Sequence, residues 1–425
     1  MNADDEVARA GLAGDRPAAT APVARPGDGD PVLRARLDAL RDDGLLRTLR
    51  TVEGAVGPRI RVDGRELLHL CGNDYLGLAG HPAVREGAAA AALAYGGGAG
   101  SSRLVAGTLT IHRELEARLA DLKGTGSALL FGAGFLANLG VVTALADKGG
   151  VVLSDALNHA SIVDGVRLSG AERVVYRHAD PEHVDHELRA RPGRPALVVT
   201  DGVFSMDGDV APLRELVAVC RRHGARLVVD EAHATGCLGP RGAGSVAAAG
   251  LEGEVDAVVG TLGKALGSSG AYVAAHPDVV AWLVNRARTV IFSTAPAPAT
   301  AGAALAALDV LAAEPERTAR LRDRAVLARE TLAGAGVDLS VPGIDPAAVD
   351  PGSPIVPVVV GEAAATMAAT AELLDDGILL QGIRPPTVAA GTCRLRLTVC
   401  ADHDPDELRA ACLRVAAAVR RAVAA

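Results

Sequence analysis

Apolar residues in the middle of the chain follow two alternating patterns. Short apolar runs bounded by Gly, Asp or His predict strands at 128–131, 151–155, 173–178, 196–201, 226–231, 257–262 and 271–275. Longer stretches with helical apolar spacing, such as 112–124 and 211–224, lie between most of them. Strand–helix alternation of this kind predicts an α/β fold, with a mostly parallel sheet that is sandwiched by helices.

The two ends of the chain differ from this middle part. Residues 1–30 are rich in Ala, Pro, Gly and Asp without apolar periodicity, which predicts a disordered N-terminal extension. An amphipathic helix is expected over 31–50 and a hairpin over 59–70, with Asp63-Gly64 as its turn. From about residue 310, helical stretches alternate with strands at 354–361 and 393–400, and a last helix begins at Pro405 behind an Asp404 cap.

These patterns predict three structured parts. They are an N-terminal helix and hairpin segment at 31–76, a large domain at 77–309 and a smaller C-terminal α/β domain at 310–425.

Composition narrows the class of protein. The net charge is -8 and the arginines are spread along the chain, so neither a nucleic-acid nor an anionic-membrane partner is expected. No apolar run approaches the ~20 residues of a membrane span, and the acidic N-terminus lacks a signal peptide's apolar region. The six cysteines include no C-x-x-C pair, so we expect reduced, mostly buried thiols, no metal site and a cytoplasmic protein.

Several polar residues stand just after the predicted strands, where the ligands of parallel sheets bind. Asp230 ends a buried strand, and a buried carboxylate is costly unless it is paired, for example with a protonated pyridine ring. His233 follows at a distance that suits a phenolic oxygen of the same ring. Lys264 lies in a Gly-rich loop between two apolar strands and can form an imine with an aldehyde. Together these residues favour pyridoxal 5'-phosphate (PLP) as the cofactor.

Three further positions suit the same cofactor. Gly132-Ala133-Gly134-Phe135 follows a strand and opens a helix, where free amides and the helix dipole favour a phosphate. His159 can stack on a ring, and Ser205 can donate a hydrogen bond to the cofactor. Each residue taken alone also has an ordinary structural interpretation: a solvated loop lysine at 264, a helix-capping histidine at 159 and a turn residue at 205.

Two other classes of protein share part of this pattern. G-x-G-x-x-A at 132–137, with Asp155 about twenty residues on, resembles a dinucleotide fingerprint and would indicate a nicotinamide-dependent oxidoreductase. That alternative leaves Asp230 and Lys264 without a task. D-E-A-H at 230–233 also occurs in helicases, but the required G-x-x-x-x-G-K-[ST] motif is absent from the sequence.

The order of these residues is similar to that of fold-type I PLP enzymes, and the longer motifs resemble the α-oxoamine synthases from about residue 32 onward. The motifs are NDYLGL (73–78), GAGSSRLVAGT (98–108), DALNHASIVDG (155–165), DGVFSMDGD (201–209), VVDEAHATG (228–236) and TLGK (261–264). The resemblance implies a PLP-dependent transferase fold like that of aspartate aminotransferase.

The resemblance also implies roles at the cofactor. Lys264 would form the Schiff base and act as the catalytic base, Asp230 would pair with the pyridinium, and His159 would stack on the ring. The other expected cofactor contacts are Ser205 and His233 to the phenolic oxygen, Thr261 to the phosphate, and the backbone of Gly134 and Phe135.

At the substrate, Arg384 would hold the amino-acid carboxylate, Arg47 and Thr387 would contact substrate, and Asn73 would position the cofactor or the substrate. Thr294 would reach the phosphate in a neighbouring subunit, because the family builds its sites across a homodimer.

The stretch 382–403 resembles one branch of the family. That branch condenses L-alanine with a pimeloyl thioester to 8-amino-7-oxononanoate in biotin biosynthesis, with coenzyme A or acyl carrier protein as the acyl carrier. A glycine-using branch such as glycine C-acetyltransferase is the nearest alternative. A non-catalytic scaffold subunit of the family is a third, against which the presence of Lys264 argues.

Overall fold

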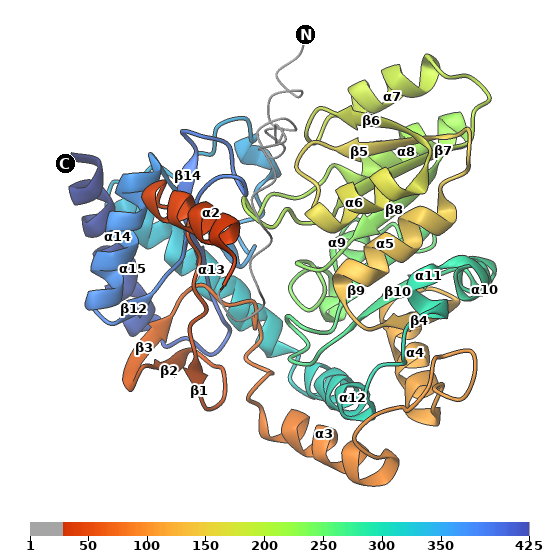
Figure 1. Cartoon of the computed structure of the whole chain (residues 1–425), viewed down its shortest axis with the longest axis horizontal. Helices are drawn as coiled ribbons and strands as arrows, with labels where there is room; N and C mark the ends of the chain where they lie inside the picture. Colours follow the sequence, from red (N-terminus) through yellow and green to blue (C-terminus); the bar gives the residue numbers. More distant parts are fainter. Residues whose placement is uncertain (1–28, 425) are drawn as a thin grey trace.

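A seven-stranded sheet forms the centre of the protein (Figure 1), for which a computed structural model describes residues 29–424. Its strand order is β4-β10-β9-β8-β7-β5-β6, and only β10 runs antiparallel to its neighbours. The strands are β4 (Ser127–Phe131), β5 (Val151–Asp155), β6 (Glu172–Tyr176), β7 (Ala196–Asp201), β8 (Arg226–Asp230), β9 (Ala257–Thr261) and β10 (Ala271–Ala275). The seven predicted strands and the mostly parallel sheet are therefore confirmed.

Helices cover both faces of this sheet. Successive strand residues point to opposite faces, so each strand contributes apolar side chains to the helices on either side. Val152 belongs to an apolar cluster with α5 and α6, whereas Val151 and Leu153 pack on the other face with α7 and α8. The helices are α3 (Pro82–Tyr95), α4 (Thr110–Lys123), α5 (Gly134–Leu145), α6 (Ala160–Ser169), α7 (Pro181–Arg189), α8 (Leu213–His223), α9 (Ser245–Ala248), α10 (Pro277–Arg286), α11 (Arg288–Ile291) and α12 (Pro298–Ala313).

The C-terminal part builds a second, smaller α/β layer (Figure 1, blue). Its three-stranded sheet has the order β11-β14-β13, made by β11 (Ile355–Gly361), β13 (Gly382–Ile383) and β14 (Cys393–Thr398). Its helices are α13 (Glu316–Gly334), α14 (Ala363–Asp375) and α15 (Pro405–Ala424). The Asp404 carboxylate accepts hydrogen bonds from the amides of Asp406 and Glu407, as the sequence predicts for a helix cap.

The N-terminal strands attach to this smaller layer. β1 (Val52–Glu53), β2 (Arg59–Val62) and β3 (Arg65–His69) form one sheet with β12 (Ile378–Leu379), which pairs parallel to β3. The β2–β3 hairpin turns at Asp63 and Gly64, both with positive φ, so the predicted turn is confirmed. The three-part division of the chain stays a prediction, and its extension at 1–30 lies almost wholly outside the described residues.

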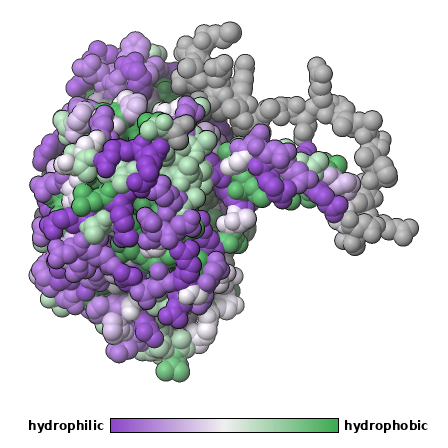
Figure 2. Space-filling model, turned by 90° about the vertical axis from the view of Figure 1, so that its left-hand side faces the viewer, coloured by the Kyte–Doolittle hydropathy of each residue, from purple (hydrophilic) through white to green (hydrophobic). Residues whose placement is uncertain are grey.

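The predicted helix over 31–50 is too long. Helix α2 (Pro31–Asp42) ends where Gly44 takes a φ of 66° and the Leu45 amide bonds back to Leu40 O. The apolar pattern continues past Asp43, but the chain leaves the helical conformation at Gly44, so the residues after it are not helical. Helix α2 buries none of its residues and projects from the body of the molecule (Figure 2).

The six cysteines are free thiols, five of them buried. Among the described residues, no helix is both long enough and apolar enough to cross a membrane.

Candidate active site

Lys264 lies in the loop that joins β9 to β10, at the carboxyl edge of the large sheet. Its Nζ atom is 2.8 Å from His233 Nε2. Burial lowers the pKa of the Lys264 amine to about 8, against the opposing charge of Asp230. An amine with this pKa is partly neutral near physiological pH and can act as a nucleophile or a base.

Asp230 ends β8 and is buried at the same edge. Its Oδ2 accepts a hydrogen bond from Asn138 Nδ2 at 2.5 Å, and its Oδ1 accepts one from the Ala232 amide at 2.8 Å. Asn138 comes from α5 and also donates to Ser161 Oγ at 2.9 Å. No role was expected for Asn138, and only its place in the helix after the Gly-rich turn points to one.

His233 connects the lysine to the segment after β3. Its Nδ1 atom lies 2.7 Å from the Tyr75 hydroxyl, while Nε2 faces Lys264. Burial lowers the pKa of His233 well below its ordinary value, and the charges of Lys264 and Arg396 lower it further. A neutral imidazole donates through one ring nitrogen and accepts through the other, so His233 links the two groups.

His159 caps helix α6, which is the ordinary interpretation of a histidine at a helix start. Its Nδ1 atom lies 2.7 Å from Ser161 Oγ and accepts a hydrogen bond from the Ser161 amide. The side chain nevertheless belongs to the same cluster. Burial lowers its pKa, and the charges of Asp230 and Lys264 both act on it.

Helix α5 presents an open N-terminus beside these residues. No side chain caps it, and within the described chain the amides of Gly134 and Phe135 have no hydrogen-bond acceptor. A Cβ atom on Gly134 would meet nothing within 4 Å, so the approach to these amides is open. Thr261 shapes the neighbouring loop, since its hydroxyl donates to Gly270 O and accepts from the Gly263 amide.

Arg396 joins three segments that the sequence analysis treated separately. From β14 its Nε atom donates to Ser205 O at 2.5 Å, Nη1 lies 3.4 Å from Asn73 Oδ1, and Nη2 lies 3.4 Å from the Tyr75 hydroxyl. The signal for it was the alternation R-L-R-L, which puts Arg394 and Arg396 on one face of a strand. Arg396 was not among the predicted site residues.

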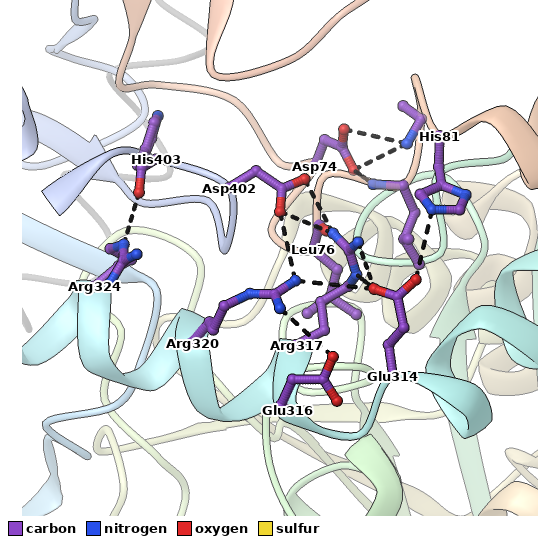
Figure 3. Close-up of polar contacts among 12 residues, drawn as sticks. Asp74, Leu76, His81, Glu314, Glu316, Arg317, Arg320, Arg324, Asp402 and His403 are labelled. Carbon is purple, nitrogen blue, oxygen red and sulfur yellow. Dashed lines mark hydrogen bonds and ion pairs between the residues drawn. The ribbon is translucent and has the colours of Figure 1, made fainter.

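Asp74 and Leu76, in the same segment as Asn73 and Tyr75, lie in a network of polar contacts with Arg317 and Asp402 (Figure 3). Arg317, on α13, donates to Leu76 O at 2.7 Å and to Asp402 Oδ1 at 2.9 Å. The Asp74 carboxylate accepts hydrogen bonds from the amides of Leu78 and Ala79, and burial raises its pKa to about 6.

The remaining predicted substrate residues form a second group. Arg384 Nη1 lies 2.7 Å from Met367 Sδ, and its Nη2 donates to Leu46 O at 3.3 Å, next to the exposed Arg47. Thr387 is exposed and its amide donates to Arg384 O. Within residues 29–424, no hydrogen bond or ion pair joins Arg384 or Arg47 directly to Lys264.

Thr294 is also exposed, in a segment that pairs with Ser102 of the GAGSSRLVAGT motif.

Asp201 is a buried acid that opens one of the family motifs but was not among the predicted site residues. It ends β7 in register with Asp230, and its two carboxyl oxygens have no hydrogen-bond partner among the described residues. Burial and the charge of Asp230 raise its pKa well above the ordinary value, which favours the protonated form of the carboxyl.

Comparison with known proteins identifies the family. The model of the family described as Aminotransferase class I and II matches residues 65–415. A curated 8-amino-7-oxononanoate synthase of Geobacter sulfurreducens is 50% identical over 383 residues, which cover 89% of this chain and 95% of the relative. One from Anaeromyxobacter dehalogenans is 52% identical over 87% of this chain and 91% of its own length. The chain belongs to the 8-amino-7-oxononanoate synthase family.

Solved structures agree with this assignment. A serine palmitoyltransferase variant from S. paucimobilis with a bound PLP–myriocin aldimine has a TM-score of 0.86 at 34% identity, covering 93% of this chain and 98% of that one. An 8-amino-7-oxononanoate synthase from Francisella tularensis has a TM-score of 0.70 at 25% identity, covering 84% and 98%. The protein is a PLP-dependent transferase with the predicted fold, and the nicotinamide alternative is excluded.

The residues present fit three groups of PLP, which are its aldehyde, its pyridine nitrogen and its phosphate. Lys264 offers an amine for the aldehyde, Asp230 a buried carboxylate for the pyridine nitrogen, and the open N-terminus of α5 two amides for the phosphate. The fingerprint acid of the nicotinamide alternative, Asp155, is occupied, since it accepts hydrogen bonds from His178 and two backbone amides.

Proposed function

We propose that this 8-amino-7-oxononanoate synthase family member condenses L-alanine with a pimeloyl thioester, releasing carbon dioxide and the carrier thiol. The observation that carries the proposal is the cluster of half-buried Lys264 with buried His233 and Asp230 beside the open end of α5. Relatives at about half identity over most of the chain support the same product.

Bound PLP supplies an electron sink for a carbanion at the amino-acid Cα. Asp230 is placed to keep the pyridine nitrogen protonated, because a buried carboxylate stabilises a cation beside it. Lys264 takes the Cα proton, and its pKa of about 8 suits a general base near neutral pH.

The bond changes then balance. The Cα–H bond breaks and the Cα–acyl bond forms as the thiolate leaves. The Cα–carboxylate bond breaks to release carbon dioxide, and the Lys264 ammonium returns a proton to Cα.

The amino-acid carboxylate has two candidate partners. Arg384 is the one that the family resemblance implies, and guanidinium geometry suits a two-pronged contact. Its contacts with Met367 and Leu46 O would have to give way. Arg396 already lies at Asn73, Tyr75 and the Ser205 turn, and that placement supports it as the second candidate.

A homodimer with shared sites fits the exposed apolar surface. Leu104, Val105 and Phe292 are exposed in the two segments that meet at the Ser102–Thr294 pairing. Large apolar side chains exposed on two neighbouring segments are typical of an interface. We propose that a second copy covers it, with Thr294 at the partner's phosphate. A cytoplasmic location stays a prediction of the sequence.

The experiment is a titration of purified holoprotein with L-alanine, glycine and L-serine, followed by pimeloyl-coenzyme A or pimeloyl acyl carrier protein. L-Alanine should change the cofactor spectrum, and mass spectrometry should then detect 8-amino-7-oxononanoate with one equivalent of carbon dioxide. Turnover with glycine or L-serine, but not with L-alanine, would assign the protein to another branch of the α-oxoamine synthases.

A further inference from the structure

His178 lies between two buried carboxylates at the carboxyl edge of the large sheet. Its Nδ1 atom is 2.9 Å from Asp155 Oδ1 and its Nε2 atom is 2.9 Å from Asp209 Oδ2. The carboxylate side chains are fully buried and the imidazole is 11% exposed. Since both ring nitrogens face a carboxylate, both must carry a proton, and the ring is an imidazolium.

The surroundings of His178 favour this charge. Burial alone lowers its pKa, but the hydrogen bonds and charges of Asp155 and Asp209 outweigh burial and raise the pKa to about 9. Within the described residues, the Asp209 carboxylate has no other hydrogen-bond partner. His178 is therefore the group that compensates the burial of Asp209.

Asp155 links the His178 imidazolium to the segment that carries His159. Besides His178, its carboxylate accepts hydrogen bonds from the amides of Leu157 and Ala179, each at 2.8 Å. These bonds shape the turn that leads from β5 to His159 at the start of α6, four residues after Asp155.

Asp209 links the same imidazolium to the turn that carries Ser205. The turn from Phe204 to Asp209 is closed by a hydrogen bond from the Phe204 amide to Asp209 O, and it carries Ser205, four residues before Asp209. The Phe204 ring packs edge-on against His178, with 4.4 Å between ring centroids. Arg396 holds the outer side of this turn through Ser205 O.

We propose that His178 is a positioning residue, whose cation joins Asp155 to Asp209 and thereby sets the spacing between His159 and Ser205 across the cofactor cleft. The proposal rests on the proposed function for the roles of those two residues. His178 itself touches neither of them in the hydrogen bonds of the described chain, so it acts through the two aspartates.

The test compares His178→Gln and Asp209→Asn with His223→Gln. His223 makes the same kind of pair, 2.8 Å from Asp185 Oδ1, but at the end of α8 that precedes β8, on the opposite edge of the sheet. Apoprotein of each variant is dialysed against PLP to measure the dissociation constant. Thermal unfolding, and kcat and KM at saturating PLP, are recorded beside it.

His178→Gln should weaken PLP binding by about tenfold or more and lower kcat, because small misplacements at a reacting centre reduce rates by up to ~10²-fold. Asp209→Asn should do the same, and it decides the matter if His178→Gln does not fold. His223→Gln should change only the melting temperature. PLP affinity and kcat within twofold of the parent in the folded variants would overturn the proposal. Failure of the parent protein to bind PLP would instead refute the proposed function.

Discussion

Lys264 Nζ and His233 Nε2 lie 2.8 Å apart, although 31 residues separate them in the chain. The contact follows from the pairing of β8 with β9. The two strands are parallel neighbours, so the loops after them open at the same edge of the sheet. A lysine at this position is shielded from water and is held by a neutral imidazole, which leaves its amine available for chemistry.

Replacing Lys264 with alanine should abolish the imine with PLP and its yellow absorbance. Turnover should fall by about 10³-fold or more, since the variant loses both the linkage and the general base. The measurement is borohydride reduction followed by peptide mapping. Lys148→Ala, which removes an exposed lysine, is the matched control and should behave like the parent. A reduced cofactor trapped on a residue other than Lys264 in the parent would contradict the assignment.

The pH dependence of cofactor uptake should report the Lys264 amine. Its pKa is lowered to about 8, and only the neutral amine attacks an aldehyde. About a tenth of it is neutral at pH 7, and nearly all of it above pH 9. Stopped-flow mixing of apoprotein with PLP should therefore show a rate that rises with pH through about 8 and levels off above about pH 9. A rate still rising steeply above pH 10 would mean that the lysine is not shielded.

Asp230→Asn keeps the shape of the side chain but removes the charge that pairs with a pyridinium. We expect exchange of the L-alanine Cα proton to fall by about 10²-fold or more, because a preorganised charge is lost from a buried site. The readout is deuterium exchange followed by NMR. Exchange at the parent rate would show that the carboxylate has no part in stabilising the carbanion.

Arg396→Lys and Arg384→Lys should separate the two candidates for the substrate carboxylate. The variant that loses the two-pronged contact should raise KM for L-alanine by about 10- to 10²-fold, the value of a charge-assisted hydrogen bond of about 1.5–3 kcal/mol. KM for the pimeloyl thioester should change less. Each arginine serves as the control for the other, and equal small effects in both would place the carboxylate elsewhere.

The stability of the apoprotein should depend on pH through His178. Its pKa rises from an ordinary 6.5 to about 9 in the folded chain, under the charges of Asp155 from β5 and Asp209 from the segment after β7. The folded state then binds the proton more tightly, so the stabilisation is fully present below pH 6.5 and is lost as pH rises through 9. Urea unfolding at several pH values should show that the difference in free energy of unfolding between the parent and His178→Gln shrinks from pH 6.5 to 9. A free-energy difference that widens with pH would contradict the raised pKa of His178.

Local patterns in the sequence were sufficient to predict the seven strands of the large sheet, the Asp63-Gly64 turn and the family. Lys264, Asp230 and His159 could be picked out because each follows an apolar run, and parallel strands place such residues on one edge. The predicted helix over 31–50 failed at Gly44, where backbone conformation outweighed the apolar spacing.

What the sequence alone determined is therefore the set of elements and the strand ends that carry the chemistry, since those depend on residues close together in the chain. Only the tertiary structure decided which distant groups meet. Arg396 reaches Ser205 across 191 positions, and Asn138 reaches Asp230 across 92. The protonation of His178 and Asp201 also depends on burial and on charges brought in from other strands, and no local pattern encodes that environment.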